Sequence, residues 1–240
     1  MMRPVYPTML LTLPFAMQLQ DLPKAMRPRE KLLALGSQAL TDVELLSVLL
    51  GSGLKGQSVL QLAQSLLDRF QGLAGLLHAS PEHLRSSKGL GGSARRSQLL
   101  AVVELSRRAL LQKMRARDIM TDPDNVKQFL QLQLGQQPRE VFGVLFLDGQ
   151  NRLLRFEEMF SGTLNQTSVY PREVVKLALS LGACAVIFSH NHPSGEVRPS
   201  QADEKLTQAL RTALALVDIR VLDHVIVGPG RCWSMAEHST

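Results

Sequence analysis

Two spacings of apolar residues divide the chain into halves. In the first half, apolar positions recur every three or four residues, which is typical of amphipathic helices. The segments with this spacing are 32–36, 41–50, 58–70 and 97–111. Local signals agree, because Thr41 and Glu44 have the spacing of a capping box, and Gly36 follows an apolar run as a stop signal. We therefore predict an all-α first half.

In the second half, short apolar runs alternate unevenly with helical segments. Charge, turn residues and a loss of periodicity mark the change near residues 114–123. The expected elements are, in order, a helix over 125–134, strands over 139–147 and 151–160 that form an antiparallel hairpin, a helix over 171–181, a buried strand over 183–188, a helix over 200–217 and a strand over 220–227. This order predicts an α/β domain.

The composition is that of a globular protein with two domains. The chain has 240 residues, of which 45% are hydrophobic, so it can form two cores. We expect a disordered extension at 1–16, a helical domain at 17–117 and an α/β domain at 118–240. No apolar stretch approaches the roughly 18 residues that a membrane span needs. We therefore expect a cytoplasmic protein with no membrane partner. Its 2 cysteines do not support a disulfide framework.

Two histidines and an aspartate in the second half suggest a metal site. His190 and His192 follow the expected buried strand at its carboxyl end. Residues at i and i+2 of a strand share a face, so the two imidazoles can point at one position. Asp203 lies in the first turn of the next expected helix. Two imidazoles and one carboxylate suit zinc and leave a fourth position for water, which is the arrangement of a catalytic site.

Asp203 also allows a purely structural interpretation. Ser200 and Asp203 have the spacing of a capping box, in which Ser200 caps the helix and the acid stabilises its positive end. Taken alone, the pair favours the cap, because such motifs are common at helix starts. The two histidines reverse that preference, since a pair at i and i+2 followed by Pro-Ser-Gly is hard to explain as packing.

These residues resemble a known family. The pattern His190-x-His192, seven residues, Ser200, two residues, Asp203 resembles the JAMM (MPN+) metalloprotease motif. The segments 190–195 and 222–228 resemble the bacterial RadC family, as in proteins called DNA repair protein RadC-like. Other segments that resemble this family are 27–31, 40–46, 139–142, 160–165 and 170–173. The resemblance implies a JAMM/MPN α/β sandwich of cytidine-deaminase-like layering, with one zinc ion per chain.

The same resemblance assigns two catalytic roles. It implies that Glu140, at the start of the first expected strand, is the general base, and that Ser200 stabilises the developing oxyanion. From the residues alone, Glu140 could equally be an exposed charge, and Glu157, Glu158 and Glu173 are rival candidates for the general base.

Asp223 and His224 could also be taken for metal ligands, but neighbouring strand residues face opposite sides, so at most one reaches the site. We interpret both as structural.

A second motif lies between two expected helices of the first half. Residues 84–96 resemble a helix-hairpin-helix motif, in which the turn with Gly89 and Gly91 brings backbone N–H groups to a DNA phosphate, and Arg95 and Arg96 add charge. A plain helical hairpin is about equally compatible with this pattern, and the residues after Gly91 depart from the usual motif.

The charge distribution favours DNA as a partner of the first half. Residues 1–118 carry 16 Lys and Arg against 8 Asp and Glu, a net charge of +8, whereas residues 119–240 carry 11 against 13, a net charge of −2. A cluster of arginines and a lysine over 95–117 has the composition of a phosphate-binding surface. A solvated basic helix face would have the same composition.

Two function hypotheses follow. The chain lacks the motifs of zincins, serine hydrolases and P-loop NTPases, and the cysteine pair of zinc deaminases. The first hypothesis is a zinc metallohydrolase that cleaves an amide or isopeptide-like bond of a protein or peptide substrate, with the helical domain localising it on DNA. The alternative is a nucleic-acid-binding accessory protein of DNA repair or recombination, whose metal site is structural or idle.

Overall fold

The computed structural model describes residues 22–77, 79–162 and 169–238. These residues form two compact units. One unit holds the described residues up to Leu73 together with Pro81–Gln98, and the other holds Ala74–Ser80 and the described residues from Leu99 onward. The extension expected at 1–16 lies outside the described residues.

The first unit is helical, as the spacing of apolar residues predicts. Its elements are η2 (Lys24–Met26), α1 (Pro28–Leu35), η3 (Ser37–Ala39), α2 (Asp42–Leu50), α3 (Val59–Arg69), α5 (Pro81–Arg85) and the first residues of α6 (Ser93–Ala116); α4 (Leu73–Leu77) begins at its boundary. The capping box predicted at Thr41 is present, with reciprocal hydrogen bonds between Thr41 and Glu44, and Ser58 forms a second one with Gln61. These caps satisfy backbone N–H groups that a helix start leaves unpaired.

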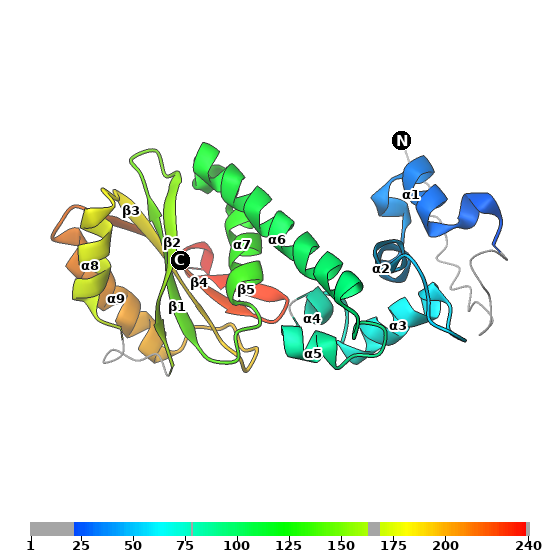
Figure 1. The fold of residues 1–240 in the computed structure, drawn as a ribbon. Helices are drawn as coiled ribbons and strands as arrows, with labels where there is room; N and C mark the ends of the chain where they lie inside the picture. Colours follow the sequence, from blue (N-terminus) through cyan, green and yellow to red (C-terminus); the bar gives the residue numbers. More distant parts are fainter. Residues whose placement is uncertain (1–21, 78, 163–168, 239–240) are drawn as a thin grey trace. The chain divides into compact units, whose positions relative to one another are not determined.

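The second unit contains a mixed sheet and the helices that cover it (Figure 1). After α6 its elements are η4 (Ile119–Thr121), α7 (Pro123–Leu134), β1 (Val141–Leu147), β2 (Leu153–Ser161), α8 (Pro171–Ser180), β3 (Ala185–Asn191), α9 (Gln201–Ala215), β4 (Arg220–Gly228), β5 (Arg231–Ser234) and η5 (Ala236–His238). The antiparallel pairing of β1 with β2 confirms the predicted hairpin. The sequence did not indicate β5, because four residues are too few to show an alternating pattern.

The strand order is β2-β1-β3-β4-β5. Strand β3 lies at the centre, antiparallel to β1 and parallel to β4. Every residue of β1 and β3 is buried, because α7 covers one face of the sheet and α8 and α9 cover the other (Figure 1). Burial on both faces explains why these strands are continuous apolar runs in the sequence.

The connection from β3 to β4 places the candidate site. Parallel strands need a crossover, and here α9 supplies it after a loop of residues 192–200. The carboxyl end of β3 therefore meets the amino end of α9, as at the ligand sites of open α/β sheets. One prediction in this region was wrong: Cys184 is exposed and precedes β3, whereas we had placed it in the buried run.

Of the helices in residues 22–77, 79–162 and 169–238, none is long and apolar enough to cross a membrane.

Candidate metal centre

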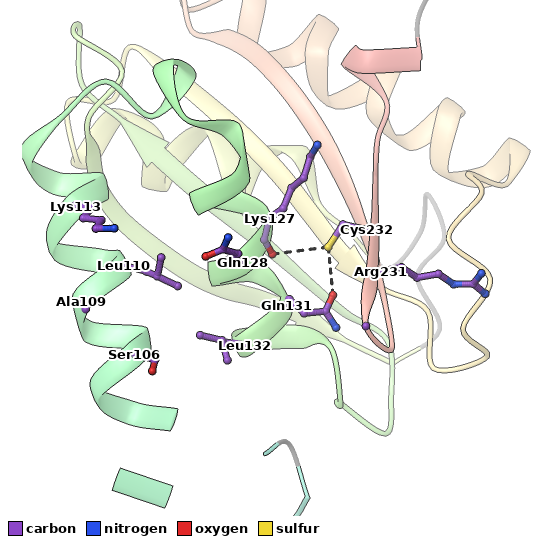
Figure 2. A pocket seen from close by; sticks show the side chains of 11 residues that line it. Ser106, Ala109, Leu110, Lys113, Lys127, Gln128, Gln131, Leu132, Arg231 and Cys232 are labelled. Carbon is purple, nitrogen blue, oxygen red and sulfur yellow. Dashed lines mark hydrogen bonds between the residues drawn. The ribbon is translucent and has the colours of Figure 1, made fainter. Parts of the chain in front are cut away.

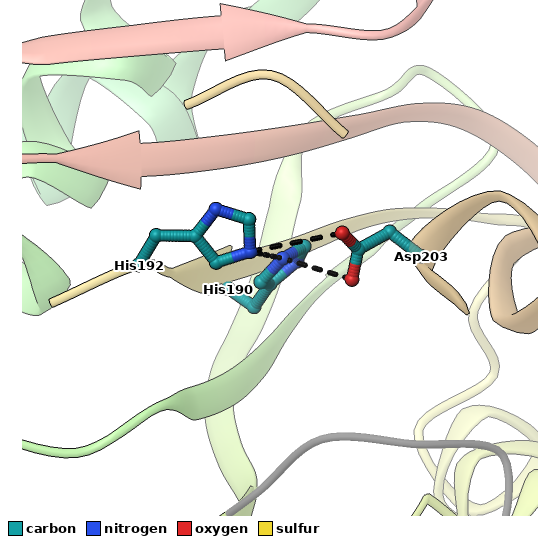
Figure 3. Close-up of side chains that lie close together, drawn as sticks. All are labelled: His190, His192 and Asp203. Atoms are coloured by element: carbon teal, nitrogen blue, oxygen red, sulfur yellow. Dashed lines mark hydrogen bonds and ion pairs between the residues drawn. The ribbon is translucent and has the colours of Figure 1, made fainter. Parts of the chain in front are cut away.

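Three side chains converge where β3 ends and α9 begins (Figure 3). His190 belongs to β3, His192 follows it directly, and Asp203 is the third residue of α9. Each residue offers one ligand atom, and these atoms lie within 4.8 Å of one another. The structure thus brings together the three residues that the sequence singled out as ligands, in a group that can hold a metal ion.

The distances in this group can be compared with those around zinc. The Nε2 atoms of His190 and His192 are 2.9 Å apart. The carboxylate oxygens of Asp203 lie 3.2 Å from Nε2 of His190 and 3.6 Å from Nε2 of His192. Zinc–nitrogen bonds of about 2.0–2.1 Å in a tetrahedron place neighbouring ligand atoms about 3.3 Å apart. The donor set fits a tetrahedral ion, and a cation would also neutralise the repulsion between lone pairs that face each other.

Asp203 serves the helix and the histidine group at the same time. Its Oδ2 accepts hydrogen bonds from the Ser200 backbone N–H at 2.7 Å and the Ser200 hydroxyl at 2.6 Å, and its own N–H donates to the Ser200 hydroxyl. The capping box is therefore present, and its acid still faces the imidazoles. Burial opposes ionisation of Asp203, but its contact with His190 and the hydrogen bonds from Ser200 outweigh it and hold the pKa well below its usual value. The carboxylate is ionised near neutral pH, as a metal ligand must be.

His190 has a second contact on the side away from Asp203. Its Nδ1 lies 2.8 Å from Nε2 of His224, and Nδ1 of His224 lies 2.6 Å from the hydroxyl of Thr207. Asp223 faces the other way, where it accepts hydrogen bonds from Ser234 and Ala236. The expectation that at most one of Asp223 and His224 reaches the site is therefore confirmed. Burial holds the pKa of His224 well below its usual value, and the nearby His190 ring adds to that effect.

His192 is oriented by the loop that follows it. Its Nδ1 lies within hydrogen-bond distance of the Glu196 carbonyl, which can only accept, so the ring donates there and turns Nε2 toward Asp203. The loop itself is held by Arg231, whose guanidinium donates to the Gly195 carbonyl. Close packing at Gly228 adds to this, because a Cβ there would lie 2.7 Å from Val197.

Glu140 lies beside this group but outside its ligand atoms. The residue directly precedes β1, and the antiparallel register pairs Phe142 with His190. Continuing that register places Glu140 opposite His192, and alternation places it on the face of Phe142 and His190. The segment is fixed by Asn191, which accepts a hydrogen bond from the Val141 N–H. The half-buried position of Glu140 is therefore well defined relative to the histidines.

Asn191 was not indicated by the sequence analysis. Its side chain makes three hydrogen bonds to the start of β1 and the segment before it: one from the Val141 N–H at 2.8 Å, and one each to the carbonyls of Gln137 and Arg139 at 3.1 Å. The residue is 2% exposed. The only sequence signal for it is its position between the two histidines, and that position does not reveal which backbone groups it meets.

In the hairpin of the first unit, several predicted DNA contacts have structural partners. The Arg95 guanidinium donates to the carbonyls of Leu50, Ser52, Gly53 and Gly89. Arg96 makes longer contacts of 3.3–3.4 Å with the carbonyls of Leu90 and Gly91. Gly89 has a positive φ of 88°, and a Cβ there would lie 2.6 Å from Leu62. Arg95 and Gly89 therefore contribute to the fold, and the contact with DNA stays a prediction.

A hollow of about 580 Å³ lies elsewhere in the second unit, between α6, α7 and β5 (Figure 2). Residues from these three elements, including Leu110, Gln131 and Cys232, line it, whereas His190, His192 and Asp203 do not. The Cys232 thiol donates to Gln131 Oε1 at 3.3 Å. Burial raises the pKa of this thiol to about 11, so it is protonated and a poor nucleophile near neutral pH.

A mixed sheet with a His/His/Asp group at the carboxyl end of its central strand defines an α/β domain with a candidate metal site. Comparison with protein families agrees with this class: residues 120–240 match the RadC-like JAB domain, and residues 19–95 match the UPF0758 N-terminal region. The chain belongs to the UPF0758 family and carries a RadC-like JAB domain in its C-terminal half.

Relatives over nearly the full chain agree with this assignment. A UPF0758 protein of Variovorax paradoxus is 59% identical over 221 residues, and one of Methylibium petroleiphilum is 61% identical over 219 residues. A third, of Albidiferax ferrireducens, is 60% identical over 231 residues. The alignments cover 91–92% of this chain and 98% of each relative. The family is therefore shown for both halves of the chain.

Proposed function

We propose that the chain is a zinc-dependent hydrolase of the JAMM metalloprotease type that cleaves an amide or isopeptide-like bond. The observation that carries this proposal is the convergence of His190, His192 and Asp203 at the end of β3, with their ligand atoms within 4.8 Å. Glu140 lies on the neighbouring strand segment, in register with the histidines. The JAB family assignment supports the same site and the same sandwich architecture, for which we propose cytidine-deaminase-like layering.

His190, His192 and Asp203 would hold one zinc ion through two imidazole nitrogens and a carboxylate oxygen. Zinc with three protein ligands acts as a Lewis acid and lowers the pKa of water toward neutrality. The burial of His190 and Asp203, which are 1% and 4% exposed, keeps competing water away from the ligands. The protein's own contribution is a preformed and largely buried set of metal-binding atoms.

Two further side chains supply the proton transfer and charge stabilisation. The Glu140 carboxylate would accept a proton from the attacking water as the new carbon–oxygen bond forms, and would then return that proton to the nitrogen of the leaving amine as the amide bond breaks. The Ser200 hydroxyl, which donates to Asp203 here, is our candidate donor to the developing oxyanion. Ser200 is exposed, so a substrate carbonyl can approach it.

The proposal is tested with Glu140→Gln in zinc-loaded protein, using panels of peptide and isopeptide substrates. Glu157→Gln is the matched control, because Glu157 lies in β2, beside the strand that Glu140 precedes, and its carboxylate pairs with Arg155. We expect wild type and Glu157→Gln to cleave the same substrates. Glu140→Gln should keep its zinc and lose at least 100-fold in rate, in line with the roughly 10²–10⁴-fold contribution of general bases. Equal rates in all three proteins would refute the role of Glu140.

A second candidate function is favoured by the charge distribution. The first 118 residues carry a net charge of +8, and Arg108 in α6 leaves 71% of its side chain exposed. We propose that the hairpin of α5 and α6, as a helix-hairpin-helix motif, holds DNA through phosphate contacts without reading its sequence. In that case the chain is a DNA repair or recombination accessory protein, and its metal site is structural or idle.

A further inference from the structure

We propose that His224 and Thr207 are positioning residues: they hold His190 in the tautomer that can bind a cation through Nε2, and they tie His190 to Asp203. The inference rests on the metal-binding part of the proposed function and is independent of the bond that is cleaved. It follows from which atoms in this buried chain of contacts can donate a hydrogen bond and which can only accept one.

The direction of this series of hydrogen bonds is set at Thr207. Its hydroxyl lies 2.6 Å from the backbone carbonyl of Asp203, one turn earlier in α9, and 2.6 Å from Nδ1 of His224. A carbonyl only accepts, so the single hydroxyl proton of Thr207 is donated to Asp203. The hydroxyl oxygen must then accept from His224, and Nδ1 of His224 must carry a proton.

The other nitrogen of His224 faces the candidate ligand. The His224 ring is 1% exposed and packs at right angles to Phe142 and Phe188, with ring centroids 5.8 Å away in both cases, so its orientation is fixed. A His190 ring that binds a cation through Nε2 carries its single proton on Nδ1, and Nε2 of His224 is then the acceptor.

The series of hydrogen bonds ends at His190, a candidate metal ligand. Nε2 of His224 lies 2.8 Å from Nδ1 of His190, so Nδ1 of His190 donates to it. The lone pair of His190 is then on Nε2, the atom that lies 2.9 Å from His192 and 3.2 Å from Asp203. The ring that must bind a cation through Nε2 is therefore held in the tautomer that can do so.

The same chain joins two ligands from different elements. His190 comes from β3, His224 from β4, and Thr207 and Asp203 from α9. At the other end, the Thr207 hydroxyl donates to the backbone carbonyl of Asp203 itself, so a shift of β3 against α9 would break these hydrogen bonds. His224 and Thr207 are buried behind the ligands, which excludes contact with a substrate and makes their role one of positioning.

The first test observes the tautomer directly. Histidine side chains labelled with ¹⁵N are followed by NMR in the full-length protein, both zinc-free and zinc-loaded, and His224 is assigned with His224→Gln. In the zinc-loaded form we expect a protonated Nδ1 and a bare Nε2 on His224. A proton on Nε2 of His224, or on both of its nitrogens, would overturn the inference.

The second test measures zinc affinity by competition with a chromophoric chelator. Thr207→Val removes the hydroxyl and keeps the shape, so it should weaken zinc binding about 10–100-fold, the usual effect of losing an outer partner of a ligand. Thr207→Ser should bind as wild type does. Thr212→Val is the matched control, because Thr212 makes the same backbone hydrogen bond in α9, to the Gln208 carbonyl, on an exposed face.

The outcomes separate this inference from the proposed function. Unchanged affinity in Thr207→Val, or equal losses in Thr207→Val and Thr212→Val, would refute the positioning role. Zinc binding that depends on Thr207 without any hydrolysis would leave the inference standing and refute the hydrolase. If Thr207→Val does not fold, the NMR measurement on wild type decides the question.

Discussion

Asn191 allows the sharpest test of how the segment that carries Glu140, just before β1, is held in place. Its side chain is 2% exposed and makes three hydrogen bonds, with Val141, Gln137 and Arg139. Asn191→Ala removes all three and leaves one backbone N–H and two carbonyls without these partners. Each lost hydrogen bond costs about 1 kcal/mol, so the loss of stability should be about 3 kcal/mol. For a chain of this size, that corresponds to a fall in Tm of roughly 6–12 °C.

The assay is thermal unfolding followed by circular dichroism, together with zinc affinity by chelator competition. The imidazoles and Asp203 are unchanged in Asn191→Ala, so zinc affinity should stay within a few-fold of wild type. The proposed hydrolysis should fall sharply, because the segment with Glu140 is no longer fixed. Asn125→Ala is the control, since Asn125 makes an exposed side-chain hydrogen bond, to Asp122. Equal Tm values for Asn191→Ala and wild type would refute the reasoning.

Three further predictions concern parts of the chain away from the ligands. At pH 8, iodoacetamide should modify the exposed thiol of Cys184 well before that of Cys232. The rate of Cys232 alkylation should rise about tenfold per pH unit up to the pKa of its thiol, about 11. Equal alkylation rates of the two cysteines at pH 8 would contradict the burial of Cys232. Gly89→Ala should lower Tm, measured by thermal unfolding, more than Gly56→Ala does. Both glycines have a positive φ, but of the two only Gly89 has a neighbour within 4 Å of the new Cβ. Equal falls in Tm would refute close packing at Gly89. Arg96→Ala should weaken binding to all DNA duplexes alike and reduce the salt slope by about 1, in filter-binding titrations at several salt concentrations; an unchanged slope would remove Arg96 from the DNA surface.

The ligand group could be predicted from the sequence because each part has a local signal. His190 and His192 are two residues apart at the end of an apolar run, and this spacing places them on one side of a strand. Asp203 was singled out by its place in the first turn of the next helix, and a capping box was the alternative interpretation; in the structure Asp203 belongs both to a capping box and to the group with the histidines. The helices and the hairpin of β1 and β2 were also predictable, since their periods and caps are encoded within a few residues.

The surroundings of the ligands could not be predicted in this way, because they depend on register between distant strands. His224 meets His190 only because β4 pairs with β3 in one particular parallel register. The partners of Asn191 depend likewise on the register of β1 against β3. Arg95 is a similar case, since no local signal shows that it donates to carbonyls more than forty residues earlier in the chain. Such contacts follow from the fold and are not contained in a short motif.

The central claim is that His190, His192 and Asp203 form a metal centre. Its most direct test is elemental analysis of protein purified without added metal, for wild type, His192→Ala and His83→Ala, a control at an exposed histidine of the helical unit. We predict about one zinc per chain in wild type and in His83→Ala, and a large loss in His192→Ala. Wild-type protein that contains no zinc and takes up none, or a His192→Ala variant that keeps its full zinc content, would contradict the claim.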